Sequence, residues 1–455
     1  MTELLINDDH RRAVEALRRS YAAIPEGTPV RLAKKTSNLF RWRDPSQAPG
    51  LDVSGFDRVL GVDPATRTAQ VQGMTTYEDL VDATLPHGLM PTVVPQLKTI
   101  TLGGAVTGLG IESSSFHLGL PHEAVQEMEV LTGDGRTVVA TRDNEHSDLF
   151  YGFPNSYGTL GYSLRLKIDL VPVKPYVKVR HLRFDDAAAA ARAMADISES
   201  RTHDGESVDF MDGTVFGPDE QYVTIGTFVD TAPYTSDYTG QKIYYRSIQQ
   251  RSVDFLTVRD YIWRWDTDWF WCSGAFGVQH PVVRRLWPDK AKRSDVYRRM
   301  VAYDRRFQVV ARVDRWRGQR PREDVIQDIE VPVENLPAFL EFFHEKIGMS
   351  PVWLCPLRAR ERWPLYPLEP GRTYVNVGFW GTVRLPPGQI PEYHNRLIER
   401  RVADLDGHKS LYSTAFYSRD EFWRYYDGET YRRLKSAYDP AERLLDLYDK
   451  CVRGR

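Results

Sequence analysis

The chain has 455 residues, of which 42% are hydrophobic and 27% are charged, and its formal net charge is −2. This length and apolar content allow two or three domains with large buried cores. The balanced charge argues against a general nucleic-acid-binding protein, which usually carries a basic excess. The three cysteines, Cys272, Cys355 and Cys451, lie too far apart to suggest a disulfide framework or a metal site, which fits a reducing cytoplasm.

The N-terminal residues become charged early, at Asp8, Asp9, Arg11 and Arg12. They lack the basic region followed by an apolar region that a signal peptide has. No stretch of the chain approaches 18 uncharged apolar residues, so we expect no membrane-spanning helix. We therefore expect a cytoplasmic protein whose contact with a membrane, if it has one, is peripheral and on the inner face of the cell membrane.

The first 175 residues predict short strands joined by turns, with two helices among them. Helices are expected at residues 10–24 and 76–85, where apolar side chains recur at helical spacing. Gly133-Asp134-Gly135 predicts a tight turn that needs positive φ angles. Alternating or β-rich runs predict strands at 58–63, 68–72, 125–131, 137–140 and 162–171.

The rest of the chain alternates predicted strands and helices, which indicates an α+β fold. The helix expected at 336–347 has Asn335 as its predicted cap and Pro337 in its first turn. Further helices are predicted at 187–198 and 391–405, and strands at 208–229 and 374–379.

Residues 284–322 form a basic segment with 14 Lys or Arg and four Asp, a local net charge of +10. Two tryptophan-rich stretches precede it, Trp263-Arg264-Trp265 and Trp269-Phe270-Trp271. Basic residues beside clustered tryptophans are what contact with anionic lipid headgroups needs. A solvated basic face beside aromatic core residues explains the same pattern, so both interpretations stay open.

Residues 91–121 contain the densest glycine cluster, with Gly103, Gly104, Gly108 and Gly110 within eight residues. Glycines at this density let the backbone approach a ligand and leave N–H groups available to phosphates. The spacing differs from the Rossmann dinucleotide fingerprint, and no strand-to-helix unit with a trailing acid follows. A crowded turn is the alternative interpretation.

Two further loops strengthen the ligand interpretation. Lys34-Lys35-Thr36-Ser37-Asn38 follows a predicted strand and is basic and hydroxyl-rich, which suits a diphosphate. Asn155-Ser156-Tyr157-Gly158-Thr159-Leu160-Gly161 is a second glycine-bearing turn before the long strand at 162–171. Three loops with backbone donors, set among strands in this order, resemble the FAD-binding (PCMH-type) domain of the vanillyl-alcohol-oxidase superfamily.

Longer motifs make the resemblance more specific. GLGIESSSFHLGL, DLFYGFPNSYGTLGY, DYIWRW, PVWLCPL and EFWRYYDGETY resemble the Delta(24)-sterol reductase family (the seladin or Diminuto group). The likeness runs from about residue 29 to about residue 448. It implies an FAD-binding domain over residues 1–175, an α+β cap or substrate domain over 176–410, and a C-terminal segment over 411–455 that packs back on the first domain.

The resemblance implies FAD as the cofactor, held without a covalent bond. Many members of the superfamily attach flavin through a histidine in the first loop, where this chain has Ser37. His117 is offset by one from a family histidine, so only a modest role is expected of it. The residues expected to contact FAD are Lys34, Lys35, Thr36, Ser37, Asn38, Thr101, Leu102, Gly103, Gly104, Gly108, Ile111, Glu112, Ser113, Ser114, Gly158, Thr159 and Gly161.

The family uses NADPH to reduce an isolated alkene, so the resemblance implies a hydride from reduced flavin and a proton from a positioned acid in a dry pocket. Glu112, Tyr261 and Asp328 are the predicted catalytic residues, with Asp266 and Tyr412 as further acid candidates. A loop-orienting role for Glu112, a salt bridge for Asp328 and core packing for Tyr261 are the alternatives. The predicted substrate-pocket residues are Arg264, Trp265, Trp269 and Cys355.

The family resemblance leaves two lipids open as substrates. Bacterial proteins that resemble this family reduce a 10-methylene fatty acyl chain to a 10-methyl chain, after a methyltransferase has added the methylene group. An expected lack of a membrane anchor and an excess of Arg over Lys, 47 to 13, favour a bacterial protein. Because bacteria seldom make sterols, the acyl substrate is expected rather than a sterol. A phospholipid-bound acyl chain and an S-adenosylmethionine-dependent lipid methyltransferase are then the expected partners, without nucleic acid.

Two other functions stay open. One is an FAD-dependent oxidase or dehydrogenase of an alcohol, sugar or hydroxy acid, as elsewhere in the superfamily. The other is a non-catalytic scaffold for a lipid methyltransferase, which the intact glycine loops argue against.

Overall fold

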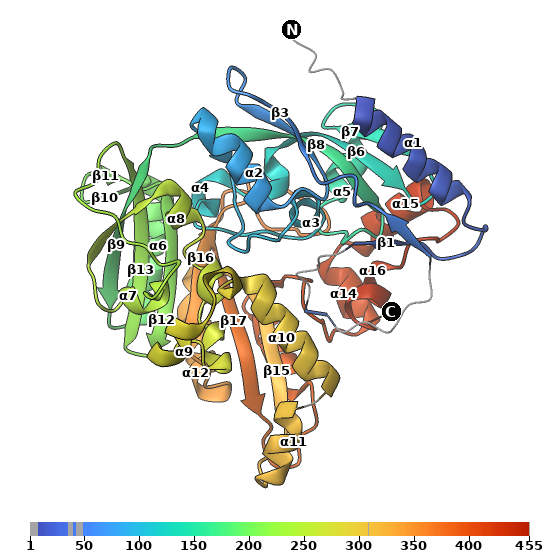
Figure 1. The fold of residues 1–455 in the computed structure, drawn as a ribbon. Helices are drawn as coiled ribbons and strands as arrows, with labels where there is room; N and C mark the ends of the chain where they lie inside the picture. Colours follow the sequence, from blue (N-terminus) through green and yellow to red (C-terminus); the bar gives the residue numbers. More distant parts are fainter. Residues whose placement is uncertain (1–7, 35–39, 42–48, 308, 455) are drawn as a thin grey trace.

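A computed structural model describes residues 8–34, 40–41, 49–307 and 309–454. Two antiparallel sheets lie side by side, and each is covered by helices (Figure 1). The first sheet takes its strands from residues 59–172 and the second from residues 176–409. The protein therefore has the two-domain α+β fold that the sequence predicts.

The first sheet has six strands in the order β3-β4-β8-β6-β7, with β5 paired to β8. Its long central strand β8 buries Leu166, Ile168 and Leu170 against the helices on one face. Helix α1 covers the other face, where His10 bonds Glu129 at 2.9 Å. The bounds are α1 Asp8–Ala22, β3 Val59–Asp63, β4 Thr68–Gln72, α2 Tyr77–Thr84, β5 Leu89–Pro91, α3 Leu102–Thr107, β6 Val125–Thr132, β7 Thr137–Thr141 and β8 Gly161–Pro172.

The second sheet has eight strands in the order β14-β9-β13-β12-β16-β17-β15-β18. Side chains alternate across it, so one face packs with helices α6, α12 and α13 into an aliphatic and phenylalanine core. The opposite face carries tryptophans and acids and looks toward the first domain. The bounds are β9 Tyr176–Phe184, α6 Ala187–Ser200, β12 Phe210–Gly217, β13 Glu220–Val229, β14 Val253–Thr257, β15 Arg322–Pro332, α12 Leu336–Lys346, β16 Val352–Leu357, β17 Tyr374–Arg384, α13 Tyr393–Asp404 and β18 His408–Lys409.

Most predicted elements are confirmed within a few residues, because their signals are local. Two details differ. Asn335 does not cap α12 with its side chain, since its amide donates to the carbonyl of Leu405 at 2.9 Å. The glycine cluster at 91–121 contains the short helix α3 where a loop was expected.

Three C-terminal helices contact the first domain. They are α14 (Arg419–Tyr425), α15 (Gly428–Tyr438) and α16 (Leu447–Cys451). Lys435 donates to the carbonyl of Thr159 at 2.8 Å, and Lys450 donates to the carbonyl of Tyr157 at 2.6 Å. The C-terminal helices therefore brace the glycine-bearing turn at 155–161.

The basic segment contributes helices α10 (Ser294–Phe307) and α11 (Val309–Trp316), which extend from the body away from the first domain (Figure 1). Among the residues that the structure describes, none of the helices combines the length and apolar composition needed to span a bilayer. The described part of the chain also has no cluster of three or more His, Cys, Asp or Glu side chains arranged to hold a metal ion.

Candidate active site

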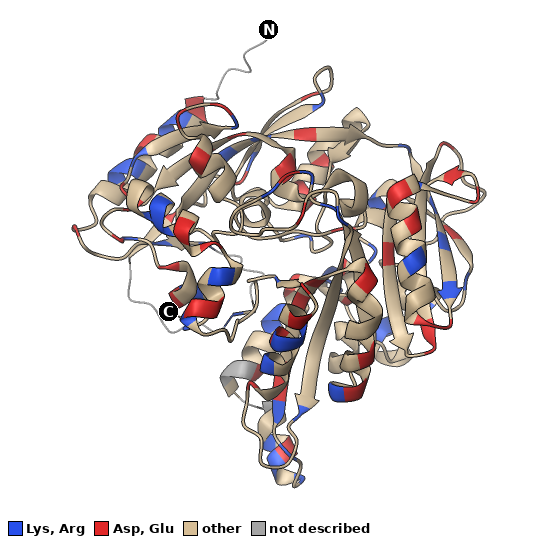
Figure 2. Ribbon diagram, turned by 180° about the vertical axis from the view of Figure 1, so that it is seen from behind, with Lys and Arg blue, Asp and Glu red and all other residues tan. Residues whose placement is uncertain are grey.

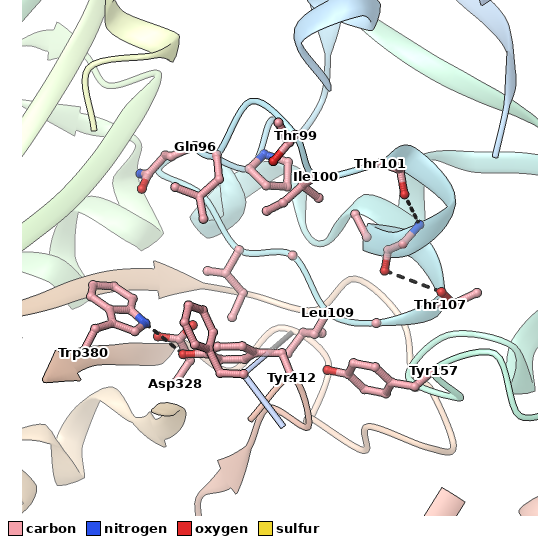
Figure 3. A pocket seen from close by; sticks show the side chains of 18 of the residues that line it. Gln96, Thr99, Ile100, Thr101, Thr107, Leu109, Tyr157, Asp328, Trp380 and Tyr412 are labelled. Carbon is pink, nitrogen blue, oxygen red and sulfur yellow. Dashed lines mark hydrogen bonds between the residues drawn. The ribbon is translucent and has the colours of Figure 1, made fainter. Parts of the chain in front are cut away.

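A cavity of about 210 Å³ lies between the first domain and the second sheet (Figure 3). Its upper wall is the chain from Pro95 to Ile111, which includes the glycine cluster. Its lower wall comes from β15, β16 and β17 of the second sheet, and from Tyr412 beyond β18. Tyr157 closes one end, and Trp269 and Phe270 add aromatic surface. The cavity therefore joins residues more than 200 positions apart.

Helix α3 forms the glycine wall. Thr101 caps the helix by accepting a bond from the N–H of Gly104 at 3.2 Å. The N–H of Gly103 donates to the carbonyl of Gly73 and that of Gly108 to the carbonyl of Gly104, both at 2.9 Å. These three N–H groups therefore bond within the protein, which corrects the expectation that they are available to phosphates.

Close packing explains why this wall uses glycine. A Cβ on Gly103 would lie 2.4 Å from the hydroxyl of Ser163, which is closer than atoms can approach. A Cβ on Gly104 would lie 2.9 Å from Oγ1 of Thr101, and Gly104 is the exposed residue of the wall. The absent side chains leave a backbone surface that a flat ligand can approach closely.

The loop at 155–161 holds Tyr157 against the cavity. The N–H of Tyr157 donates to the carbonyl of Thr107 at 2.7 Å, and the backbone of Tyr157 has a φ of 50°. Positive φ in a bulky residue costs free energy and persists where the surroundings impose it. Gly158, with a φ of 74°, completes the turn. The glycines of this loop therefore shape the backbone that positions the Tyr157 ring.

Aromatic side chains cover the lower wall. Trp353 of β16 and Trp380 of β17 lie on the face of the second sheet that looks toward the first domain. Phe270 stacks on Trp380, with ring centroids 4.3 Å apart. The indole N–H of Trp380 donates to the hydroxyl of Tyr412 at 2.8 Å (Figure 3). The wall is therefore apolar, with one hydroxyl held in place.

Asp328 of β15 is the carboxylate on this wall (Figure 3). Burial raises its pKa from 3.8 to about 7, and the neighbouring polar groups of Asn376 and Tyr412 oppose the rise. Its Oδ1 atom is buried without a hydrogen-bond partner among the described residues. Glu330, two residues along the strand, is fully buried and accepts a bond from Tyr366. Asp328 is therefore a carboxylic acid that can hold a proton near neutral pH.

The unsatisfied polar groups of the cavity indicate the chemistry of its ligand. The hydroxyl of Tyr157, Nε2 of Gln96 and Oδ1 of Asp328 are each buried without a partner among the residues that the structure describes. Buried polar groups are normally satisfied, so a ligand with several hydrogen-bonding atoms is expected here. A flavin ring has such atoms along its edge and flat apolar faces, so these residues and the open Gly104 backbone fit FAD.

Glu112 and Tyr261 lie outside the cavity in a buried cluster around Arg264. The Arg264 guanidinium bonds Asp212 at 2.8 Å and Glu112 at 3.5 Å, and it lies 3.9 Å from the Tyr261 ring centroid. Burial raises the pKa of Glu112, which the charge of Arg264 opposes. The Glu112 carboxylate accepts a bond from the Ser113 hydroxyl at 2.6 Å. These contacts hold Glu112 and Tyr261 in this cluster. Of the three predicted catalytic residues, Asp328 is therefore the one that faces the cavity.

The other predicted site residues fall into three groups. Lys34, Thr101, Gly104, Gly108, Ile111 and Trp269 line the cavity. Leu102, Gly103, Ser113, Ser114, Gly158, Thr159, Gly161, Arg264, Trp265 and Cys355 lie behind its walls. Lys35, Thr36, Ser37 and Asn38 lie outside the described residues. Asp266 bonds the N–H of Lys98 and the hydroxyl of Ser294, and His117 bonds the carbonyl of Asp209.

Sequence reasoning missed several residues of the cavity wall. They are Phe40, Gln96, Tyr157, Phe270, Trp353 and Trp380. Alternation along β16 and β17 could have identified two of them, because Trp353 and Trp380 share the sheet face of Cys355 and Asn376. The position of Tyr157 depends on a positive φ and on contacts with α3, for which the sequence has no direct signal.

Comparisons with known proteins agree with this arrangement. A family model described as an FAD binding domain matches residues 12–141. A Delta(24)-sterol reductase of Arabidopsis thaliana is 27% identical over 89% of this chain and 77% of its own length. The human Delta(24)-sterol reductase is 27% identical over 89% of this chain and 76% of its own length.

A further similarity covers a shorter stretch of the chain. A decaprenylphosphoryl-beta-D-ribose oxidase of Mycolicibacterium smegmatis is 32% identical over 125 residues, which is 27% of each chain. The chain is an FAD-dependent oxidoreductase with a PCMH-type FAD-binding domain, and it is a homologue of the Delta(24)-sterol reductases over most of its length.

Proposed function

We propose that the protein reduces an isolated carbon–carbon double bond in a lipid, with FAD as cofactor and NADPH as hydride donor. The observation that carries the proposal is the position of Asp328, an acid with a pKa of about 7, on an aromatic wall opposite the glycine wall. Reduction of an alkene needs a proton for one carbon and a hydride for the other. An acid facing a flavin site across an apolar cavity meets both needs.

The chemistry that FAD supplies when it is bound is the uptake of a hydride from NADPH and its delivery to carbon. Asp328 holds the proton on its carboxyl group because burial disfavours the charged form. Donation of this proton to the unsubstituted end of a 1,1-disubstituted alkene leaves a tertiary cation, which the hydride then neutralises. The carboxylate regains a proton from solvent, so each turnover consumes one hydride and one proton.

The aromatic wall positions the alkene and excludes water. Trp380 and Phe270 stack and present flat apolar surface beside Asp328. The hydroxyl of Tyr412, fixed by the indole N–H of Trp380, lies close enough to Asp328 to bond its carboxylate. We infer that this hydroxyl orients the acid toward the cavity. A dry cavity also keeps the intermediate cation from being captured by water.

For the substrate we propose a 10-methylene fatty acyl chain, carried on a phospholipid and reduced to a 10-methyl chain. The resemblance of the motifs to the Delta(24)-sterol reductase family supports it, because bacterial proteins that resemble this family reduce such a chain. This alkene is 1,1-disubstituted, so its protonation gives the tertiary cation described above. The protein that adds the methylene group would be a methyltransferase that uses S-adenosylmethionine, and it would be the expected partner in the cytoplasm or at the inner face of the cell membrane.

The second candidate substrate is a sterol with a side-chain double bond. The names of the relatives that span most of the chain favour it. Both candidates would present a branched aliphatic alkene to the same wall, so both reactions would use Asp328 as the acid. Their comparison is therefore an experiment on specificity within one proposed reaction.

The test is an anaerobic half-reaction. The purified protein is reduced with NADPH, 10-methylene-stearoyl phospholipid is added, and the return of oxidised-flavin absorbance is followed together with product analysis. Prompt return with formation of the 10-methyl chain supports the proposal. Return with a Delta(24)-sterol alone moves the substrate to the sterol. Failure of NADPH to bleach the flavin, with fast reoxidation of dithionite-reduced flavin by oxygen, would favour the alcohol-oxidase alternative.

A further inference from the structure

An arm extends from the second domain and exposes a stripe of apolar side chains. We define the arm as residues 294–307 and 309–322, which comprise α10, α11 and the turn that follows them. Trp316 is 85% exposed, Tyr303 62%, Val310 49% and Val313 40%. Val310, Val313 and Trp316 recur every three residues, so they share one side of α11. Isolated exposed apolar residues are ordinary, but a continuous exposed stripe marks an interaction surface.

Arginines flank this stripe. Arg312, Arg315, Arg317 and Arg320 are all exposed. The acid among them, Asp314, is buried and already bonds Arg322 at 2.7 Å and Arg384 at 3.4 Å. The exposed end of the arm is therefore strongly basic, and Figure 2 shows Arg in blue along its helices.

The arm is held in place at both ends. At its base, the hydroxyl of Ser294 donates to Asp266 at 2.6 Å, and the hydroxyl of Tyr297 donates to the carbonyl of Thr267 at 3.2 Å. At its tip, the Asp314 pairs fasten α11 to the ends of β15 and β17. These bonds hold the arm in place, so its exposed apolar side chains are not required for packing against the rest of the chain.

A further exposed apolar residue, from another segment of the chain, lies near the tip. The register of β15 and β17 pairs Arg322 with Arg384, and the N–H of Leu385 donates to the carbonyl of Pro321 at 2.9 Å. The loop that follows β17 therefore starts beside the arm, and it carries Ile390, which is 76% exposed. Apolar side chains of two chain segments thus emerge at this end of the molecule.

We propose that this arm docks on an anionic lipid bilayer. Helices that lie in a membrane surface combine an apolar face with flanking Arg or Lys. Trp316 and the two valines would enter the interface, and the four arginines would meet acidic headgroups. The stripe of valines distinguishes this surface from one for nucleic acid, because hydrocarbon side chains have no partner on a phosphate backbone.

The expectation drawn from the sequence placed the lipid contact on different tryptophans. Trp263, Trp265 and Trp269 are buried, with 2%, 1% and 4% exposure, so they form core and cavity wall. Part of the positive charge is also structural, because buried Arg284 bonds Asp268 at 2.6 Å. The lipid contact therefore moves to the arm itself, with Trp316 as its main aromatic residue.

The arm is also continuous with the cavity. Its base bonds Asp266 and Thr267, which directly precede the cavity residues Trp269 and Phe270. Helix α10 has 14 residues and is therefore about 20 Å long. A bilayer bound at the tip would lie within the combined length of α10 and α11 from the base of the arm. The docking proposal stands without the reductase proposal, since it concerns a surface outside the cavity.

The test is vesicle flotation of the FAD-loaded protein with two vesicle compositions, phosphatidylcholine alone and phosphatidylcholine with 30 mol% phosphatidylglycerol. We expect binding to the anionic vesicles and much weaker binding to the neutral ones. Arg312→Gln/Arg315→Gln/Arg317→Gln should lower the partition coefficient by ~5-fold per charge, or on the order of 100-fold in total. Val313→Ser/Trp316→Ser should lower it by ~10-fold or more.

Matched control variants carry the same changes elsewhere on the surface. Arg18→Gln/Arg192→Gln/Arg433→Gln removes three exposed arginines outside the arm, and Tyr234→Ser removes an exposed aromatic ring. Both should bind anionic vesicles as the unchanged protein does. Flavin absorbance and the melting temperature establish that every variant is folded.

Three outcomes would overturn the proposal. They are the absence of binding to either vesicle, equal losses in the arm variants and in their controls, and tighter binding of the arm to single-stranded RNA than to vesicles in a gel-shift assay. None of these outcomes depends on the reaction. Vesicle binding by a protein that fails to reduce alkenes would keep the docking surface and refute the reductase proposal alone.

Discussion

Replacement of Asp328 by Asn is the sharpest test of the proposed proton donor. The amide keeps the size and polarity of the side chain but has no proton to donate. Positioned acids contribute roughly 10²–10⁴-fold to rate, so we expect reoxidation of the flavin by the alkene to slow by about that factor. Flavin reduction by NADPH needs no acid and should stay within about threefold of the original rate.

The pH dependence follows from the raised pKa of Asp328. The protonated form is present below about pH 7 and disappears as the pH rises through it. The alkene half-reaction should therefore be constant at low pH and fall about tenfold per unit above pH 7. In Asp328→Asn the residual rate should not follow this profile. Stopped-flow absorbance from pH 5.5 to 9 measures both proteins.

Asp328→Asn should change stability and activity in opposite directions. Because the folded-state pKa of Asp328 lies above its unfolded value of 3.8, the unfolded chain releases this proton first. The free energy of unfolding therefore falls as the pH rises from about 4 to about 7. The full shift corresponds to about 4 kcal/mol, an upper bound for a half-buried group. Asp328→Asn avoids this loss and should be the more stable protein at pH 8.

Urea unfolding of the protein and of Asp328→Asn at pH 5 and pH 8 measures that difference. The reasoning about Asp328 would be refuted by a variant that retains the alkene half-reaction within about tenfold, or by a variant that slows but keeps the original pH profile. In either case another group delivers the proton. A variant that loses flavin would be rescued for this purpose by excess FAD, so that binding and chemistry stay separate.

The remaining predictions concern the glycine wall, the buried ion pair and the arm. Gly104→Val places a side chain against Thr101 on the cavity wall. It should weaken FAD binding, measured by titration, at least ~10-fold. Gly240 has open space around it, so the control Gly240→Ala should leave FAD binding unchanged. Arg264→Met leaves Asp212 buried without its charge partner. The loss of a buried partner costs about 3–5 kcal/mol, so the melting temperature of this variant should fall. An equal fall in the surface control Arg433→Gln would contradict the assignment. Vesicle flotation of the arm variants is the fourth prediction, with the outcomes described above.

The elements and the cofactor domain could be predicted because their signals are local. The alternation along residues 162–171 is that of a half-buried strand, and Gly135 in the turn at 133–135 has a φ of 83°, a conformation that favours glycine. The irregular motifs at 108–120 and 148–162 identify the FAD-binding domain without reference to the fold. Local conformational propensities act within a few residues, so they can be predicted from the sequence of those residues.

The roles of the acids were decided by the tertiary structure. Glu112 and Asp328 are both acids with apolar neighbours in the sequence, yet one pairs with Arg264 and the other faces a cavity. The difference arises from contacts between segments more than 100 residues apart. Burial raises the pKa of both acids, but at Glu112 a buried guanidinium opposes the rise, whereas Asp328 lies among aromatic rings.

The tryptophans make the same point about apolar side chains. The sequence shows that this chain is rich in Trp beside Arg. It predicted Trp265 and Trp269 as pocket residues, left a lipid contact open for the stretches that hold them, and assigned Trp316 no role. The fold buries Trp265 between the two domains and leaves Trp316 at the end of an arm. Whether a tryptophan packs a core, lines a cavity or faces a lipid depends on which surface the rest of the chain brings against it, because the hydrophobic effect is proportional to area removed from water and not to sequence position.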